Sequence, residues 1–229
     1  MSFDVLAPHY RWLEWVLAGT KLQRCRTTYL AEVRRPSRIL IAGEGNGRFL
    51  VECGRAFPQA AITVIDASVG MLKQAEKRLV SSGLPAHRVS FVHGNILNWE
   101  LQNAAHDFVV THFFLDCFDE AELQNVVSRL SAAASADAQW LIADFQMPSV
   151  GWQKWRAQLI HALMYAFFRP VTKLSARRVV PPQPFLETAG FTRTRSRRFN
   201  WGLLGAELWE RKVKAATFAS PKLAASGEH

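Results

Sequence analysis

The chain has 229 residues, of which 49% are hydrophobic, and a formal net charge of +9 at pH 7. This length and composition predict one domain with a single good core. No apolar run approaches the ~20 residues needed to span a bilayer, and residues 1–6 lack the basic start of a signal peptide, so we expect a cytoplasmic protein. Three cysteines are far apart and outside any CxxC motif, which predicts reduced thiols and no metal site. They are Cys25, Cys53 and Cys117.

Two helices are expected before the first strand, over residues 3–18 and 22–33. The first carries apolar and aromatic residues at helical spacing. Trp12 and Trp15 are expected to pack this helix onto the sheet. Tyr10 is expected either to pack in the same way or to lie in the functional site.

A short apolar strand, Ile39–Ala42, leads into Gly43-Glu44-Gly45-Asn46-Gly47, and helical character follows over residues 46–57. Glycines let the backbone turn sharply and approach a ligand without a Cβ atom in the way. The N-terminus of the following helix offers free N–H groups. The pattern therefore predicts a nucleotide-binding loop.

A second β-rich run, Ile62–Asp66, ends on a carboxylate that lies 19 residues after Gly47. An acid at this offset reaches ribose hydroxyls in nucleotide-binding sheets. Dinucleotide-dependent oxidoreductases share the acid, but their fingerprint requires a third glycine at position 48, where this chain has Arg48. An NAD(P)-dependent oxidoreductase is therefore the less favoured alternative.

The next elements alternate between helices and strands: a helix over 68–82, strands over 88–92 and 107–111, a helix from the N-cap Asp119 to residue 134, and a strand over 139–144. This alternation predicts an α/β fold, a doubly wound Rossmann-like sheet with helices on both faces. Ligands bind such sheets at the carboxyl ends of the strands.

Residues 149–169 predict a helix with Trp155 and Leu159 among its apolar residues and only basic charges. It could line a pocket for a lipophilic acceptor, rest on an anionic membrane, pack in the core or form a homodimer contact. A short helix follows over 185–189, then a strand over 191–199 with one basic face, a turn and a last strand over 203–210. Residues 169–214 hold eleven Lys or Arg against three Glu, a charge that attracts anionic partners.

These segments together resemble the class I S-adenosylmethionine-dependent methyltransferases over residues 3–211. The glycine loop is similar to the first motif of that family, and residues 65–72, 89–97 and 106–115 are similar to the next three. The resemblance implies a seven-stranded, mostly parallel sheet with an antiparallel last strand. It also implies one domain over 1–214, with a helical lid (1–35), a substrate-cover insertion (149–186) and a disordered tail (215–229). Residues 3–10 resemble the quinone-biosynthesis group.

The resemblance implies S-adenosyl-L-methionine as the cofactor and a small, lipophilic or acidic molecule as the acceptor. Asp66 is expected on the ribose, with Ala67 and Met71 on the adenine, and Asn95 takes the place of the usual acid near the adenine amino group. The family commonly has an acid where this chain has Ile41, and Glu44 is expected to replace it near the ammonium group of the donor. The cofactor-binding residues expected are Gly43, Glu44, Gly45, Gly47, Asp66, Ala67, Met71, Asn95, Ile96 and Thr111.

A general base is needed if the acceptor atom is oxygen or carbon. The candidates are His112 and Asp116 after the fourth strand, and Tyr10 on the lid. Two further candidates are His9, also on the lid, and His161, on the substrate-cover insertion. The chain lacks the Asn/Asp-Pro-Pro-Tyr pattern of the enzymes that methylate amino groups of nucleic acids, so no nucleic-acid acceptor is expected. A cofactor-binding protein without transferase activity is the second alternative.

Overall fold

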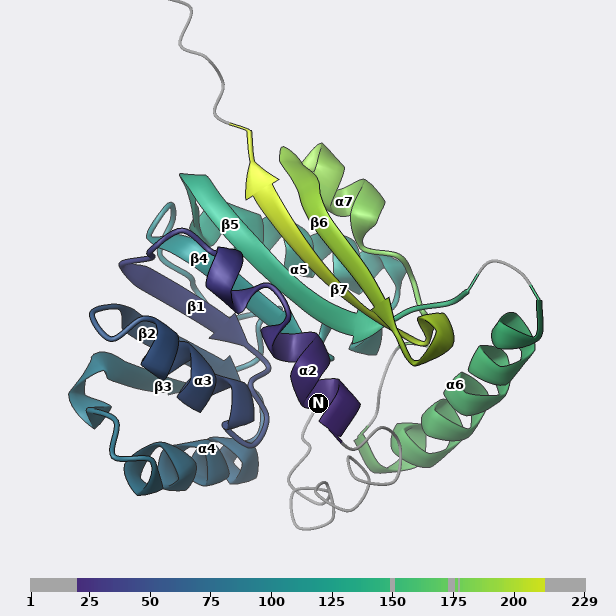
Figure 1. Cartoon of the computed structure of the whole chain (residues 1–229), viewed down its shortest axis with the longest axis horizontal. Coiled ribbons are helices and arrows are strands. Elements are labelled where there is room, and N and C mark those ends of the chain that lie inside the picture. The colour runs from purple at the N-terminus through teal and green to yellow at the C-terminus, as the bar shows by residue number, and fades with distance from the viewer. Residues whose placement is uncertain (1–19, 149–150, 173–175, 177, 213–229) are drawn as a thin grey trace, which may run out of the picture.

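The computed structural model describes residues 20–148, 151–172, 176 and 178–212 (Figure 1). The expected helix over 3–18, with His9 and Tyr10, and the tail over 215–229 lie outside these residues.

Seven strands form one sheet in the order β3-β2-β1-β4-β5-β7-β6. β1 to β5 run parallel, and β7 is antiparallel to both of its neighbours. This is the mixed α/β sheet that the sequence predicts. The strands are β1 Arg38–Ala42, β2 Ala61–Asp66, β3 Val89–His93, β4 His106–His112, β5 Ala134–Phe145, β6 Phe191–Phe199 and β7 Leu204–Arg211.

Helices cover both faces of the sheet (Figure 1). The core on one face includes side chains of α2, α3 and α4, and the core on the other face includes side chains of α5 and α7. Ile39 and Ile41 of β1 point into the first core and Leu40 into the second, as expected for a strand buried on both sides. The helices are α2 Thr20–Thr27, α3 Arg48–Ala56, α4 Val69–Ser81, α5 Glu120–Ala133, α6 Gly151–Thr172 and α7 Gln183–Thr188.

The predicted helix over 22–33 is wrong in its second half. α2 ends at Thr27, and only a 3-10 turn, Leu30–Glu32, follows. The hydroxyl groups of Thr27 and Thr28 donate to the carbonyl oxygens of Gln23 and Arg24. β-branched residues that bond back in this way favour the end of a helix over its continuation.

The α5 boundary agrees with the sequence, since the carboxylate of Asp119 accepts a hydrogen bond from the Glu122 N–H at 3.0 Å and caps the helix. β5 is longer than predicted because it begins at Ala134, directly after α5, where Ala134 pairs with His106 of β4.

The prediction of one basic face on β6 is also wrong. A register shift lies between Arg193 and Arg195, and an extra residue in a strand reverses the faces of the residues that follow. Arg193 pairs with Glu207 on the α5/α7 side, at 2.9 Å. Arg195 instead bonds Glu32 beside α2, at 2.7 Å. The arginines of β6 therefore divide between the two faces.

Helix α6 stands away from the sheet at one end of the molecule (Figure 1). Ala157 and His161 are buried, whereas four large apolar side chains on the other side of the helix are exposed. Their exposed fractions are 59% for Trp152, 77% for Trp155, 63% for Leu159 and 63% for Leu163. Spacings of three and four residues place these side chains in one stripe. Among the described residues, no helix combines the length and the apolar character needed to cross a membrane.

Candidate functional site

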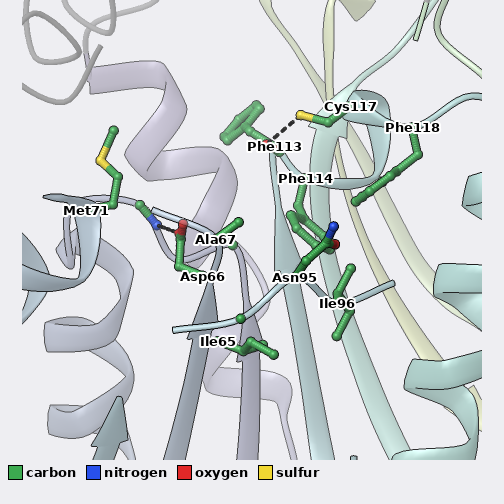
Figure 2. A pocket seen from close by; sticks show the side chains of 13 residues that line it. Ile65, Asp66, Ala67, Met71, Asn95, Ile96, Phe113, Phe114, Cys117 and Phe118 are labelled. Atoms are coloured by element: carbon green, nitrogen blue, oxygen red, sulfur yellow. Dashed lines mark hydrogen bonds between the residues drawn. The ribbon is translucent and has the colours of Figure 1, made fainter. Parts of the chain in front are cut away.

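An open cavity lies at the carboxyl ends of the strands from β1 to β4, with an empty space of about 720 Å³. Parallel strands place their carboxyl ends at one edge of the sheet, where ligands bind in folds of this kind. Figure 2 shows the side chains that converge on the cavity. The residues that line it are Gly43, Gly45, Ile65, Asp66, Ala67, Met71, Gly94, Asn95, Ile96, Phe113, Phe114, Cys117 and Phe118.

The three glycines of the loop after β1 have positive φ values, of 71°, 69° and 82°, but different surroundings. A Cβ atom on Gly43 would overlap the ring of Phe114, at 2.2 Å. One on Gly45 would meet nothing within 4 Å. One on Gly47 would lie 2.6 Å from the Cα atom of Ala75 in α4. Gly45 therefore opens onto the cavity, whereas Gly47 lies outside its lining and lets α3 pack closely on α4.

Asp66 ends β2 at the edge of the cavity, and the backbone around it orients its carboxylate (Figure 2). Oδ2 accepts a hydrogen bond from the Gly45 N–H at 3.2 Å, and Oδ1 accepts one from the Ser68 N–H at 2.9 Å. Ser68 in turn caps α4 by accepting from the Met71 N–H. A carboxylate offers about four acceptor positions and can accept more than one hydrogen bond on each oxygen.

Asn95 and Ile96 follow β3 and line the cavity opposite Met71 and Ala67 (Figure 2). The side-chain oxygen of Asn95 accepts from the Leu97 N–H at 3.0 Å. This local bond holds the side chain in place and leaves its amide N–H₂ group as a donor.

The aromatic part of the cavity wall was missing from the sequence prediction. Phe113, Phe114, Cys117 and Phe118 follow β4 and line the cavity, as do Ile65 and Gly94. Phe113 has a φ of 52°, a conformation that is uncommon outside glycine. The sequence did contain a signal for this wall, namely phenylalanines in a loop directly after a buried strand, because connecting loops are usually polar.

Glu44 is buried and lies outside the lining of the cavity. Its Oε1 atom accepts from the Leu50 N–H in the first turn of α3, at 2.9 Å. Burial raises the pKa of Glu44 to about 7, while the Leu50 N–H and the charge of Arg26 oppose this rise. Glu44 therefore caps α3 from within the loop rather than facing a ligand in the cavity.

Thr111 and His112, at the end of β4, also lie outside the lining of the cavity. The Thr111 hydroxyl accepts a hydrogen bond from the Trp140 indole N–H at 3.0 Å. The His112 ring packs edge-on against Phe49, at 4.3 Å between centroids, and its nitrogens have no hydrogen-bond partner among the described residues. Burial and the charge of Arg26 lower the pKa of His112 well below its usual value, so His112 is a weak proton acceptor.

Asp116 and Asp144 form a buried pair. The Asp116 N–H donates to Oδ2 of Asp144 at 3.2 Å. Burial raises the pKa of both carboxyl groups, and the charge of Asp116 raises the pKa of Asp144 further. A hydrogen bond between the two carboxyl groups favours an ionised Asp116 beside a protonated Asp144. The sequence predicted Asp116, but not Asp144, as a candidate base.

His161 lies on the buried side of α6, with its ring 5.7 Å from that of Phe145. Burial lowers its pKa to about 4. Trp155 and Leu159, on the same helix, lie outside the lining of the cavity. Among the described residues, no group of His, Cys, Asp or Glu has the arrangement of a metal site.

Residues 39–137 match a protein family described as "Methyltransferase domain". The matched segment runs from β1 to the start of β5 and includes every residue that lines the cavity. No curated protein sequence matches the chain. This part of the chain, less than half of its length, is therefore similar to methyltransferase domains.

Solved structures share the fold at low sequence identity. An O-methyltransferase family protein from Burkholderia thailandensis superposes with a TM-score of 0.68 and 17% identity, over 91% of this chain and 60% of that one. Mitomycin 7-O-methyltransferase superposes with a TM-score of 0.67 and 17% identity, over 93% of this chain and 61% of that one. The chain thus spans about 60% of the length of these two relatives.

A third structure is closer in length. It is the 1,6-didemethyltoxoflavin-N1-methyltransferase of B. thailandensis with bound 1,6-didemethyltoxoflavin and S-adenosylhomocysteine. It superposes with a TM-score of 0.65 and 17% identity, over 91% of this chain and 85% of that one.

Proposed function

We propose that this chain transfers the methyl group of S-adenosylmethionine to a small acceptor molecule. The observation that carries the proposal is the carboxylate of Asp66, held by the Gly45 N–H at the mouth of a cavity of about 720 Å³. The methyltransferase relatives of known structure support it, one of them with bound S-adenosylhomocysteine.

The residues of the cavity fit the donor. Asp66 would accept hydrogen bonds from the two ribose hydroxyls. Met71, Ala67 and Ile96 would pack against the adenine, with Asn95 at its polar edge. Gly43 and Gly45 would let the loop approach the rest of the molecule.

When bound, S-adenosylmethionine supplies a methyl group that its sulfonium already activates. The chain's own residues then have to position the acceptor in line and exclude water. Phe113, Phe114 and Phe118 provide an apolar wall that would exclude water from the donor. Oxygen or carbon acceptors also have to lose a proton.

We propose that Asp116 and Asp144 accept the proton that such an acceptor loses. Burial raises the pKa of both carboxyl groups, which makes the pair a better proton acceptor than an exposed carboxylate. His112 is less suited because its pKa is depressed by burial. Tyr10, outside the described residues, remains the other candidate from the sequence.

Helix α6 is proposed to dock on an anionic membrane surface. Its exposed stripe combines two tryptophans with two leucines, and residues 151–172 contain basic residues but no Asp or Glu. The Arg156 guanidinium and the Lys21 ammonium group lie over the ring of Trp201, beside the start of the helix. Tryptophan anchors with flanking basic groups suit the headgroup region of anionic lipids. The pocket-lining role predicted for Trp155 and Leu159 has less support.

Methyl transfer to a quinone precursor, as in the group that residues 3–10 resemble, is one version of this function. The described relatives act on other small molecules, at oxygen in one case and at N1 in another, so the acceptor atom stays open.

Thermal shift with S-adenosylmethionine, S-adenosylhomocysteine and NADH tests the donor. We expect stabilisation by the first two and none by NADH, because any ligand that binds only the folded state raises the melting temperature. Stabilisation by NADH alone would favour an oxidoreductase. Transfer of a radiolabelled methyl group to a panel of small acids and quinols then separates an enzyme from a protein that only binds the cofactor.

A further inference from the structure

A second cavity, of about 890 Å³, lies beside the carboxyl end of β5. It is enclosed by β5, β7, β6 and the segment over 179–183 that leads into α7. Its polar side chains include Asp144, Gln146, Arg193, Arg198 and Glu207. Figure 1 shows the β6–β7 hairpin beside β5, with α7 next to β6.

The register shift in β6 determines which arginines face this cavity. Arg193 and Arg198 both line it. They are five positions apart in the chain, and regular alternation would place them on opposite faces of the strand. Arg197 pairs with Ala206 in the core on the other face, and its guanidinium lies over the ring of Phe199, at 5.3 Å.

The buried carboxylate in the cavity wall is fully engaged by the protein. Glu207 accepts from Arg193 at 2.9 Å, from the Gln146 amide at 3.3 Å and from the Trp209 indole N–H at 2.9 Å. Gln146 can reach Glu207 because it lies across Gly205, where a Cβ atom would come within 2.1 Å of the amide. The charges of Arg193 and Glu207 therefore cancel within the wall.

Arg198 is different. Its side chain is exposed and makes no hydrogen bond or ion pair with another described residue. Its partner in the register of β7 is Gly205, which has no side chain to compete for the guanidinium. Asp144, the other carboxyl group of the cavity, is buried and paired with Asp116. One uncompensated positive charge therefore faces the cavity, and it comes from Arg198.

Asp116 and Asp144 connect the walls of the two cavities. Asp144 lines the second cavity, the Asp116 N–H bonds to Asp144 at 3.2 Å, and Cys117, next in the chain, lines the first cavity. A molecule in the second cavity would thus lie against the carboxyl pair to which the acceptor proton is assigned.

We propose that the second cavity binds the acceptor, and that Arg198 selects a small carboxylic acid by pairing with its carboxylate. This inference rests on the proposed function. The apolar part of the acid would lie against Met147, Val179 and Pro181, which form the rest of the wall. A guanidinium forms two parallel hydrogen bonds with a carboxylate, and a neutral amide cannot reproduce both.

The test measures binding of four carboxylates, benzoate, 2-hydroxybenzoate, 1-naphthoate and hexanoate, and of their four amides. Saturation-transfer NMR and calorimetry on the full chain, with and without S-adenosylhomocysteine, provide the affinities. We expect at least one acid to bind and its amide to bind roughly tenfold more weakly, as for the loss of a charge-assisted hydrogen bond.

Variants of two adjacent arginines separate recognition from general charge. Arg198→Gln should weaken the acid about tenfold and leave the amide unchanged, and Arg198→Lys should restore part of the affinity. Arg197→Gln removes an equal charge from the other face of the sheet and should not change the affinity for the acid. Both arginine side chains are exposed, and circular dichroism checks the fold of all three variants.

Three results would overturn the inference: no acid binds the wild-type chain, acid and amide bind equally tightly, or Arg197→Gln lowers the affinity for the acid as much as Arg198→Gln does. The cofactor distinguishes this failure from failure of the proposed function. If S-adenosylhomocysteine binds and no acid does, only the inference fails. If acids bind through Arg198 and S-adenosylhomocysteine does not bind, the proposed function fails.

Discussion

The cavity at β1 to β4 is lined by glycines, one carboxylate and mostly apolar side chains, whereas the cavity at β5 to β7 is lined by several charged and amide side chains. In the first, the Gly45 N–H orients Asp66 and Gly45 leaves its side of the cavity open. In the second, Arg193, Arg198 and Gln146 form the wall. The first cavity falls entirely within the segment that matches the methyltransferase family, and every residue that lines the second lies beyond it.

This difference has a chemical reason. A donor that is common to a whole family can be held by a backbone conformation that needs only a few glycines and one acid. An acceptor that differs between proteins is more easily recognised by side chains, which single substitutions can change. The predictions below test whether the two regions act separately.

The largest effect is expected from Gly45→Val. Its φ of 69° is unfavourable for a β-branched residue, and the new side chain would enter the open cavity. We expect S-adenosylmethionine binding to fall below detection in calorimetry. Gly83→Val is the matched control, because Gly83 also has a positive φ and open space but lies outside the cavity lining. Equal loss in both variants would mean that backbone strain, not the ligand, explains the effect.

Asp66→Ala should weaken S-adenosylmethionine binding by about 1–3 kcal/mol, the cost of removing a charged hydrogen-bond partner. Asp107→Ala is the control, because this carboxylate also accepts from backbone N–H groups, those of Ser37 and Arg38, but lies outside the cavity lining. It should lower stability without changing donor affinity. Unchanged affinity in a folded Asp66→Ala protein would remove Asp66 from the donor site.

The pH dependence of stability should reveal Glu44. Its pKa is about 7 in the folded protein against a reference value of 4.5, so between these values the folded state holds a proton that the unfolded chain releases. The free energy of unfolding should therefore fall as the pH rises from about 4.5 to about 7, by at most roughly 3 kcal/mol. Urea titrations across this range measure it.

Glu44→Gln should flatten this part of the profile, because the amide keeps an acceptor oxygen for the Leu50 N–H but does not titrate. An unchanged slope would assign the pH dependence to other groups.

The smallest effect concerns helix α6. Replacing Trp155 and Leu159 by serine should lower co-sedimentation with anionic vesicles severalfold, and salt should weaken the wild-type binding by screening the basic groups. Donor affinity should not change. Val80→Ser, at an exposed apolar position on α4, is the control. If vesicles do not bind and light scattering shows a dimer that the serine variant dissociates, the stripe is a protein interface.

Local sequence patterns were sufficient for the alternation of strands and helices, the glycine loop and the position of Asp66. Each depends on residues that are close in the chain: an apolar run, glycines at alternate positions and an acid at a strand end. The antiparallel β7 also followed from the sequence, through the turn at Asn200–Gly202 that precedes it.

Only the tertiary structure decided which of these residues face the cavity. Gly47 packs against Ala75, Glu44 caps α3, and Asp116 meets Asp144 from 28 residues away. The shift in β6 places Arg193 and Arg198 on the same face. Such roles depend on contacts between distant segments and on strand register, and neither property is written in the spacing of neighbouring residues.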